Sequence, residues 1–290
     1  MVLSYLSYVP LDKSWIIRQG MLDLINGCTD IIRFLRKQEK LSDDLLALKR
    51  VAENWNSSNP LDVGESGTLY RFVKFTLWKL NKQREIIIRG SLKNRKICDN
   101  SAIVNWPLKK LLQLDNGTSQ WASASVLNGN GEKVENSGLK LQLTCEAVEH
   151  WKEARNAGKC WEARLDKTIA RQAIAFLNLL KTRKLEFKPE HSEDYCFVRA
   201  FNLITPEEGK ERFPSLEGHE TNRILEMEKA LDEAKEYGRI SSKDHRVIQA
   251  VVMKYMAKRK EIDVKHKNAV NKSWPKFWDF MDCCRGISKF

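Results

Sequence analysis

Apolar residues recur at helical spacing through most of the chain, which predicts a protein rich in helices. After Ser14, a residue type suited to cap a helix, Ile17, Met21, Leu24 and Ile25 would share one helical face. A second helix is expected to begin within 41–44. The same periodicity predicts further helices over residues 68–80, 119–127, 143–154, 168–180, 195–203, 221–237 and 243–257.

Short segments between the predicted helices have the pattern of strands. Residues 85–89 are mostly apolar, and residues 184–188 alternate polar and apolar positions. Strand and helix follow one another through both halves of the chain, and this order favours an α/β architecture. A chain of 290 residues also exceeds the length that one core usually fills, so two domains are expected.

The composition narrows the kind of partner. Lys and Arg total 50 against 38 Asp and Glu, and the net charge of +12 favours an anionic partner. The seven cysteines form no CxxC pair and no spacing that suits a zinc site, and their odd number without a secretory signal predicts reduced thiols. No stretch approaches the roughly 18 apolar residues of a membrane span, and the N-terminus lacks the pattern of a secretory signal. We therefore expect a cytoplasmic protein.

Six polar clusters place a cation, hydroxyl or acid beside an expected helix start. Helix N-termini expose unpaired backbone N–H groups and a partial positive charge. A set of such termini that carry Lys and Arg suits a ligand with several negative groups, which predicts an anionic small-molecule site. The clusters are Lys13 and Ser14 with Arg18, residues 66–68, Lys93 with Arg95, residues 118–120, residues 219–223 and residues 244–246, and Lys272 follows alone.

In their order along the chain and in their local sequence, these clusters resemble the motifs of the 5-enolpyruvylshikimate-3-phosphate (EPSP) synthase family, the enolpyruvyl transferases of the shikimate pathway. The resemblance covers essentially the whole chain. Residues 12–14 with Arg18 resemble the opening DKS…R motif, and residues 64–72 resemble the glycine-threonine segment. The remaining matches are residues 92–95 to the arginine turn, 118–120 to Ser-Ser-Gln, 193–203 to the helix with the essential aspartate, 219–223 to Lys-Glu-Thr-Asp-Arg, 244–246 to Asp-His-Arg and 272–275 to Lys-Thr-Phe-Pro.

The resemblance implies a fold and a division into domains. Members of this family are two-domain inverse α/β barrels built from βαβαββ repeats. Here one repeat region would be shortened, between Thr168 and Asp194. The inserted domain would span 13–164 and bind the acceptor, shikimate 3-phosphate. The discontinuous domain would comprise 1–12 and 165–290 and supply phosphoenolpyruvate-binding and acid/base residues.

The resemblance also implies the reaction. The enolpyruvyl group of phosphoenolpyruvate would pass to the 5-hydroxyl of shikimate 3-phosphate with release of phosphate, a step of aromatic amino acid biosynthesis that needs neither cofactor nor metal. These two metabolites would be the partners of a monomer, with no nucleic acid and no membrane involved. Asp194 would take the hydroxyl proton, Glu220 would serve the methylene carbon, and Lys13 would stabilise charge near the bridging atoms.

The binding residues follow from the same motifs. Guanidinium groups pair with carboxylate and phosphate through parallel hydrogen bonds, which suits the arginines among them to anionic substrates. Phosphoenolpyruvate would contact Lys13, Gly67, Arg95, Gln120, Arg223, Arg246 and Lys272. Shikimate 3-phosphate would contact Lys13, Ser14, Arg18, Thr118, Ser119, Gln120, Ser137, Asp194 and His219.

Four departures from the family pattern keep other functions open. His219, Asn222, Lys96 and Lys140 stand where the family has lysine, aspartate, proline and tyrosine. A transferase acting on a different acceptor is one alternative, and an inactive member of the family is another. The net charge and the lysine-rich run 254–267 allow a third alternative, a basic nucleic-acid-binding protein.

Overall fold

The computed structural model describes residues 5–129, 138–217 and 222–287, and most of them are helical. Helix accounts for 64% and strand for only 5% of the chain. In the described residues, β1 (Leu61–Gly64) pairs in parallel with β2 (Ile86–Ile88), and β3 (Arg239–Ile240) pairs in parallel with β4 (Asp263–Val264). There is no barrel in this part of the chain. The expected α/β architecture, an inverse α/β barrel of βαβαββ repeats, is therefore wrong.

The chain divides into two compact units, each with its own core. Unit 1 comprises residues 1–10 and 165–290, and unit 2 comprises residues 11–164. The expected domain boundaries at 12 and 164 lie next to these limits. Within unit 2 the backbone N–H of Asp12 donates to the carbonyl oxygen of Arg164 at 2.7 Å. Within unit 1 the backbone N–H of Asp166 donates to the carbonyl oxygen of Pro10 at 2.9 Å.

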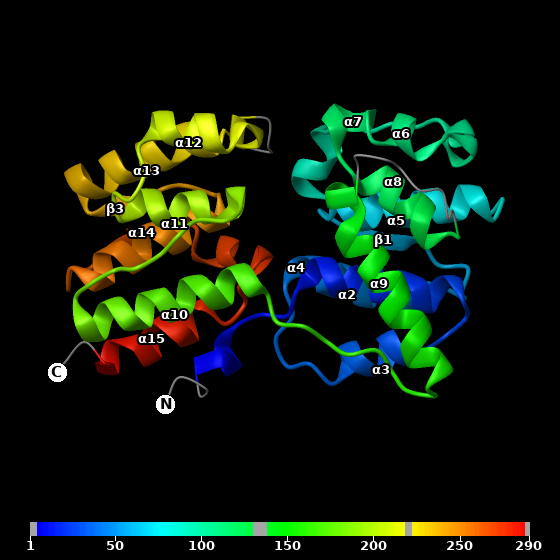
Figure 1. The fold of residues 1–290 in the computed structure, drawn as a ribbon, viewed down its shortest axis with the longest axis horizontal. Coiled ribbons are helices and arrows are strands. Elements are labelled where there is room, and N and C mark those ends of the chain that lie inside the picture. Colours follow the sequence, from blue (N-terminus) through cyan, green and yellow to red (C-terminus); the bar gives the residue numbers. More distant parts are fainter. Residues whose placement is uncertain (1–4, 130–137, 218–221, 288–290) are drawn as a thin grey trace. The chain divides into compact units, whose positions relative to one another are not determined.

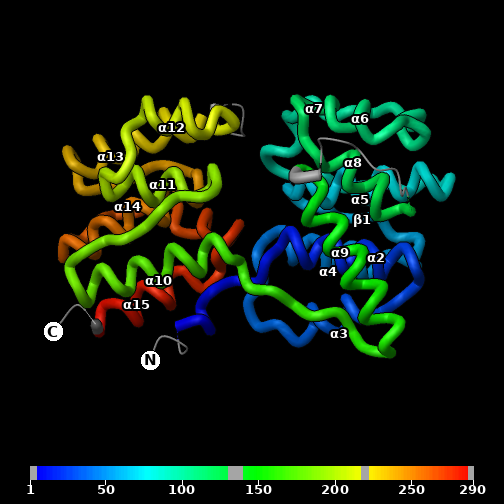
Figure 2. The backbone as a smooth tube through the Cα atoms, viewed as in Figure 1, coloured from blue at the N-terminus to red at the C-terminus, as the bar shows by residue number. Residues whose placement is uncertain are grey.

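Unit 2 is a set of helices around the short β1–β2 sheet (Figures 1 and 2). Its core includes Trp15, Phe72, Phe75 and Trp121, none more than 1% exposed. Helix packs on helix, with α2 against α9 and α5 against α8. The elements are α2 (Lys13–Ile25), α3 (Asp30–Arg36), α4 (Asp43–Asn54), α5 (Gly67–Lys79), η2 (Gly90–Asn94), η3 (Ser101–Asn105), α6 (Leu108–Leu111), α7 (Leu114–Gly117), α8 (Gln120–Leu127) and α9 (Gly138–Asn156).

Unit 1 is also helical, and its helices α10 and α15 lie side by side (Figure 1). Phe176, Tyr195, Trp274 and Phe280 are fully buried in its core. The elements are η1 (Leu6–Tyr8), α10 (Lys167–Thr182), η4 (Ser192–Asp194), α11 (Tyr195–Ala200), α12 (Pro206–Arg212), η5 (Pro214–Glu217), α13 (Arg223–Tyr237), α14 (His245–Ala257), η6 (Lys267–Lys272) and α15 (Phe277–Ile287).

Acidic and hydroxyl side chains begin the helices that carry the polar clusters. Asp12 caps α2 and Asp244 caps α14, each accepting hydrogen bonds from two backbone N–H groups. Ser66 caps α5 and Asn222 caps α13. Each cap satisfies donors that a helix end leaves free. The first cap is Asp12 and not Ser14, which lies within the first turn.

The segment 184–188 is not a strand in the structure. Its alternation instead reflects packing, because Leu185 and Phe187 are half-buried against the unit 1 core. The Phe187 ring meets the Phe197 ring edge-on with centroids 5.0 Å apart. An extended segment shows alternating apolar and polar residues whenever every second side chain packs on a core. This alternation does not require a hydrogen-bonded neighbouring strand.

In the described parts of both units, no helix has the length and apolar character needed to cross a membrane.

Candidate anion-binding site

The start of α5 presents backbone donors beside a guanidinium group. Ser66 accepts a hydrogen bond from the N–H of Leu69 at 3.4 Å. The N–H groups of Gly67 and Thr68 have no acceptor among the described residues. The Nη1 atom of Arg95 lies 2.8 Å from the position that a Cβ on Gly67 would take. An anion here would meet two N–H donors, the positive end of a helix and a cation.

Gln120, the first residue of α8, is held in one orientation beside α5. Its Oε1 accepts from Nη1 of Arg71 at 2.7 Å, and its Nε2 donates to Oγ1 of Thr68 at 2.8 Å. Arg71 also donates to the carbonyl oxygen of Gly67 at 3.1 Å and to Asp115 at 2.7 Å. Because the Thr68 oxygen accepts from Gln120, the threonine proton can be donated to a bound anion.

The first turns of α2 carry a paired cation and a buried one. Nζ of Lys13 forms an ion pair with Asp44 at 2.6 Å. Arg18 is only 7% exposed. Its Nε donates to Oγ1 of Thr144 at 2.8 Å, and its Nη1 donates to the carbonyl oxygen of Ser14 at 2.8 Å.

The charge of Arg18 has no close counter-ion in the described chain. Burial lowers the pKa of its guanidinium to about 10, and the charge of Asp12 acts in the opposite direction. No carboxylate of the described residues forms an ion pair with it. Because an uncompensated buried charge is costly, a cation kept in this state is suited to bind an anionic ligand.

The remaining acceptor residues of unit 2 lie at or near the start of α8. Oγ1 of Thr118 accepts from the backbone N–H of Gln120 at 3.4 Å. Ser119 precedes the helix, and its hydroxyl makes no cap hydrogen bond. Ser137 lies outside the described residues.

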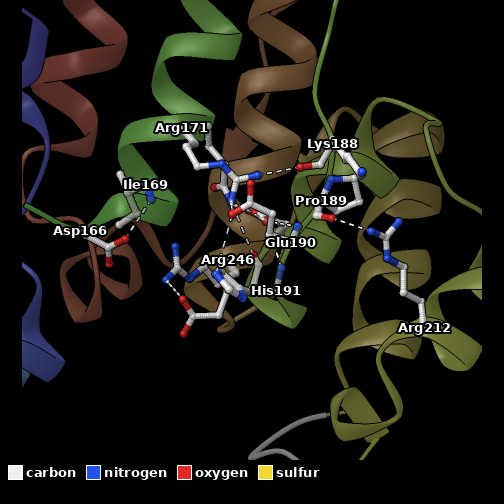
Figure 3. A network of polar contacts seen from close by, with 12 residues as sticks. Asp166, Ile169, Arg171, Lys188, Pro189, Glu190, His191, Arg212 and Arg246 are labelled. Atoms are coloured by element: carbon white, nitrogen blue, oxygen red, sulfur yellow. Dashed lines mark hydrogen bonds and ion pairs between the residues drawn. The ribbon is translucent and has the colours of Figure 1, made fainter. Parts of the chain in front are cut away.

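In unit 1, the carboxylate of Asp194 is fully buried and accepts from several donors. Its Oδ1 accepts from Nε2 of Gln172 at 2.9 Å. Its Oδ2 accepts from the N–H groups of Glu190 at 2.9 Å and His191 at 3.3 Å, and from Nη1 of Arg171 at 3.4 Å. Figure 3 shows Arg171 between this cluster and Lys188, whose carbonyl oxygen it also contacts. Both oxygens of Asp194 are thus engaged within unit 1.

Arg246, in the first turn of α14, is buried with unused donors. It is 4% exposed, and its Nη2 donates to Glu193 at 3.0 Å. Its Nε and Nη1 atoms find no hydrogen-bond partner in the described chain. Figure 3 labels Arg246 to the left of Glu190 and His191. This guanidinium therefore retains capacity to bind a carboxylate or phosphate.

Arg223, at the start of α13, is paired inside unit 1. Its Nε donates to Asp244 at 2.9 Å. Burial by itself would raise the pKa of the Asp244 carboxyl, but the charges of Arg223 and His245 and the N–H of Arg246 outweigh burial. The pKa of Asp244 therefore lies well below its ordinary value.

Lys272 ends η6 and is half-buried. The predicted residues His219 and Glu220 lie outside the described residues.

The structure brings Gly67, Arg95 and Gln120 together near the start of α5. In unit 1, Arg246 donates to Glu193, and Glu193 directly precedes Asp194 in the chain. Asp194 itself accepts from Gln172. Sequence reasoning missed the residues that hold these groups in place. They are Arg71, Asp115, Arg171 and Gln172.

Comparison of the chain with protein-family models, curated proteins and solved structures finds no match.

Proposed function

We propose that this protein is a cytoplasmic enolpyruvyl transferase that moves the enolpyruvyl group of phosphoenolpyruvate to the 5-hydroxyl of shikimate 3-phosphate. The hydroxyl attacks C2 of phosphoenolpyruvate while C3 gains a proton. The adduct then expels phosphate and returns the proton from C3. The described residues do not form the barrel of that family, so the fold does not support the proposal. The support comes from the order of the motifs and from the local geometry of the helix starts.

The start of α5 is the observation that carries the proposal. The N–H groups of Gly67 and Thr68, which have no acceptor among the described residues, and the nearby Arg95 guanidinium are donors. Phosphoenolpyruvate carries a phosphate and a carboxylate, and both accept hydrogen bonds from such groups. Gln120 orients the Thr68 hydroxyl through a hydrogen bond of 2.8 Å. We assign phosphoenolpyruvate to this site.

Arg18 supports an anionic acceptor in the same unit. Its buried guanidinium forms no ion pair with a carboxylate in the described chain, and it donates to the Thr144 hydroxyl and to the carbonyl oxygen of Ser14. A phosphorylated polyol offers a carboxylate or phosphate to the cation and ring hydroxyls to neighbouring polar groups. We assign shikimate 3-phosphate to Arg18 together with Ser14, Thr118 and Ser119.

The resemblance assigns the proton transfers to two carboxylates. Asp194 would take the hydroxyl proton and Glu220 would serve C3. Accepting a proton at Asp194 requires one of its present hydrogen bonds to break, because both of its oxygens are engaged. This saturation favours a second candidate function, in which the protein binds the same anions without turning them over.

One assay separates the two candidates. Phosphate release from phosphoenolpyruvate would be followed with shikimate 3-phosphate present or omitted, in the parent protein and in Asp194→Asn and Glu220→Gln. Transfer predicts acceptor-dependent release that both substitutions reduce by about a hundredfold or more. Saturable binding of both metabolites without release would support the second candidate. Absence of both binding and release would reject both candidates.

Gly67→Ala is expected to weaken phosphoenolpyruvate binding by about tenfold, because its methyl group would displace the end of the Arg95 side chain. The free energy of unfolding should change by less than about 1 kcal/mol, since the group that moves is flexible. Calorimetric titration and urea unfolding would measure the two effects. Gly286→Ala is the control, because a Cβ there meets nothing within 4 Å. Equal affinity in both variants would contradict the assignment.

A further inference from the structure

We propose that Asp115 is the positioning residue of the phosphoenolpyruvate site and acts through Arg71. The inference rests on the proposed function for the identity of the ligand. The side chains of Asp115 and Arg71 are 7% and 8% exposed, and Nε of Arg71 lies 2.7 Å from Oδ2 of Asp115. Neither residue is among those assigned to contact substrate.

The Asp115 carboxylate joins three segments of unit 2. Its Oδ2 accepts from Arg71 on α5 and from Nε1 of Trp121 on α8 at 2.8 Å. Its Oδ1 accepts from the backbone N–H of Cys98 at 2.9 Å, three residues beyond Arg95. These segments carry Gly67, Gln120 and Arg95. One buried anion thereby fixes the spacing of the three elements that would meet the ligand.

Arg71, which is held by Asp115, fixes the orientation of the Gln120 side chain. The same Nη1 atom donates to Oε1 of Gln120 and to the carbonyl oxygen of Gly67. The Gln120 amide must therefore turn its NH₂ group to Thr68, which leaves the threonine hydroxyl as a donor. The Thr68 hydroxyl can then donate to a bound anion, so this part of the site should favour a fully ionised oxyanion over neutral ester or amide analogues.

The backbone around Asp115 is held in a specific conformation. Asp115 has φ 49° and ψ 51°, and Asn116 has φ 63° and ψ 35°, both in the left-handed region. Asp and Asn tolerate this region better than most residues. Asp115→Asn therefore keeps the backbone preference and removes the charge. Its NH₂ group would face N–H donors in place of one carboxylate oxygen.

The experiment compares Asp115→Asn with Asp99→Asn, which removes the same charge from a side chain that is 75% exposed and pairs with Lys74. We expect Asp115→Asn to weaken phosphoenolpyruvate binding about tenfold to a hundredfold. Equal phosphoenolpyruvate affinity in the two variants would overturn the proposal.

The side-chain amide of Gln120 provides a readout that does not depend on the ligand. Its NMR signals can be assigned as those lost in Gln120→Glu. They should shift toward the values of a free glutamine amide in Asp115→Asn and stay in place in Asp99→Asn. If the parent protein binds no phosphoenolpyruvate, the proposed function fails, while a shift of these signals still supports the positioning role. Unchanged signals would overturn that role.

Arg71→Lys serves if Asp115→Asn does not fold. A lysine can still pair with Asp115, but it cannot reach Gln120 and Gly67 at the same time as a guanidinium does. The Gln120 signals should move and phosphoenolpyruvate affinity should fall. Retention of both would contradict the proposal.

Discussion

Asp23→Ala is expected to lower the free energy of unfolding of unit 2 by about 3 to 5 kcal/mol. Asp23 is fully buried on α2. Its Oδ1 accepts from Nε1 of Trp151 and from Arg155, each at 2.8 Å, and its Oδ2 accepts from Nε1 of Trp161 and from the N–H of Ile31, each at 2.9 Å. The substitution leaves donors from three other segments without their acceptor. Urea unfolding followed by tryptophan fluorescence would measure the loss.

Glu53→Ala is the matched control for this substitution. It also removes one carboxylate from an ion pair, but its partner Arg36 is 63% exposed. Exposed pairs contribute little, so the expected change is below about 1 kcal/mol. A similar small change for Asp23→Ala would show that α2, α3 and α9 are held together by apolar packing alone.

Arg246→Met is expected to raise the free energy of unfolding by about 1 to 2 kcal/mol and to abolish anion binding at this guanidinium. The guanidinium is 4% exposed and leaves Nε and Nη1 unpartnered in the described chain. An apolar side chain of similar length removes that cost. Glu193, its partner, is 48% exposed and can be hydrated. A gain in stability with a loss of binding is the signature of a residue kept for its ligand.

Glu193→Gln tests the same contact from the other side. It leaves Arg246 buried with a weaker partner, so stability should fall by about 1 kcal/mol or less. If Arg246→Met raises the free energy of unfolding and Glu193→Gln lowers it, the buried arginine is the group that destabilises the fold. A clear loss of stability in Arg246→Met, measured by thermal and urea unfolding, would show that this side chain is part of the fold and would contradict the interpretation.

Helix positions could be read from the sequence because their signals are local. The prediction of 68–80 compares with Gly67–Lys79 for α5, and that of 119–127 with Gln120–Leu127 for α8. Caps and apolar periodicity act within a few residues, so the described residues of most polar clusters coincide with helix starts. Lys93 and Arg95 are the exception, because they lie at the end of η2.

The fold class could not be read in the same way. The segment 85–89 does contain β2, but its only described partner is the short strand β1. Residues 184–188 follow a strand pattern because alternate side chains pack on the core. Whether a segment joins a sheet depends on a partner distant in sequence, and periodicity carries no information about that partner.

In the candidate site, too, local features could be predicted from the sequence and long-range contacts could not. Gly67, Arg95 and Gln120 were predicted from motifs, and the structure brings them together. Asp115 and Arg71 were missed, although Asp115 opens an Asp-Asn-Gly sequence typical of left-handed backbone. Such a sequence predicts a turn. It does not reveal that the carboxylate is directed inward onto an arginine of another helix.

The central claim is that the start of α5 binds phosphoenolpyruvate. The most direct test is a titration of the ¹⁵N-labelled parent protein with phosphoenolpyruvate, followed at the backbone amides of Gly67 and Thr68. The account predicts that both signals shift and saturate together, and that inorganic phosphate competes. Saturation at other amides while these two stay unchanged, or no shift at any amide, would contradict it.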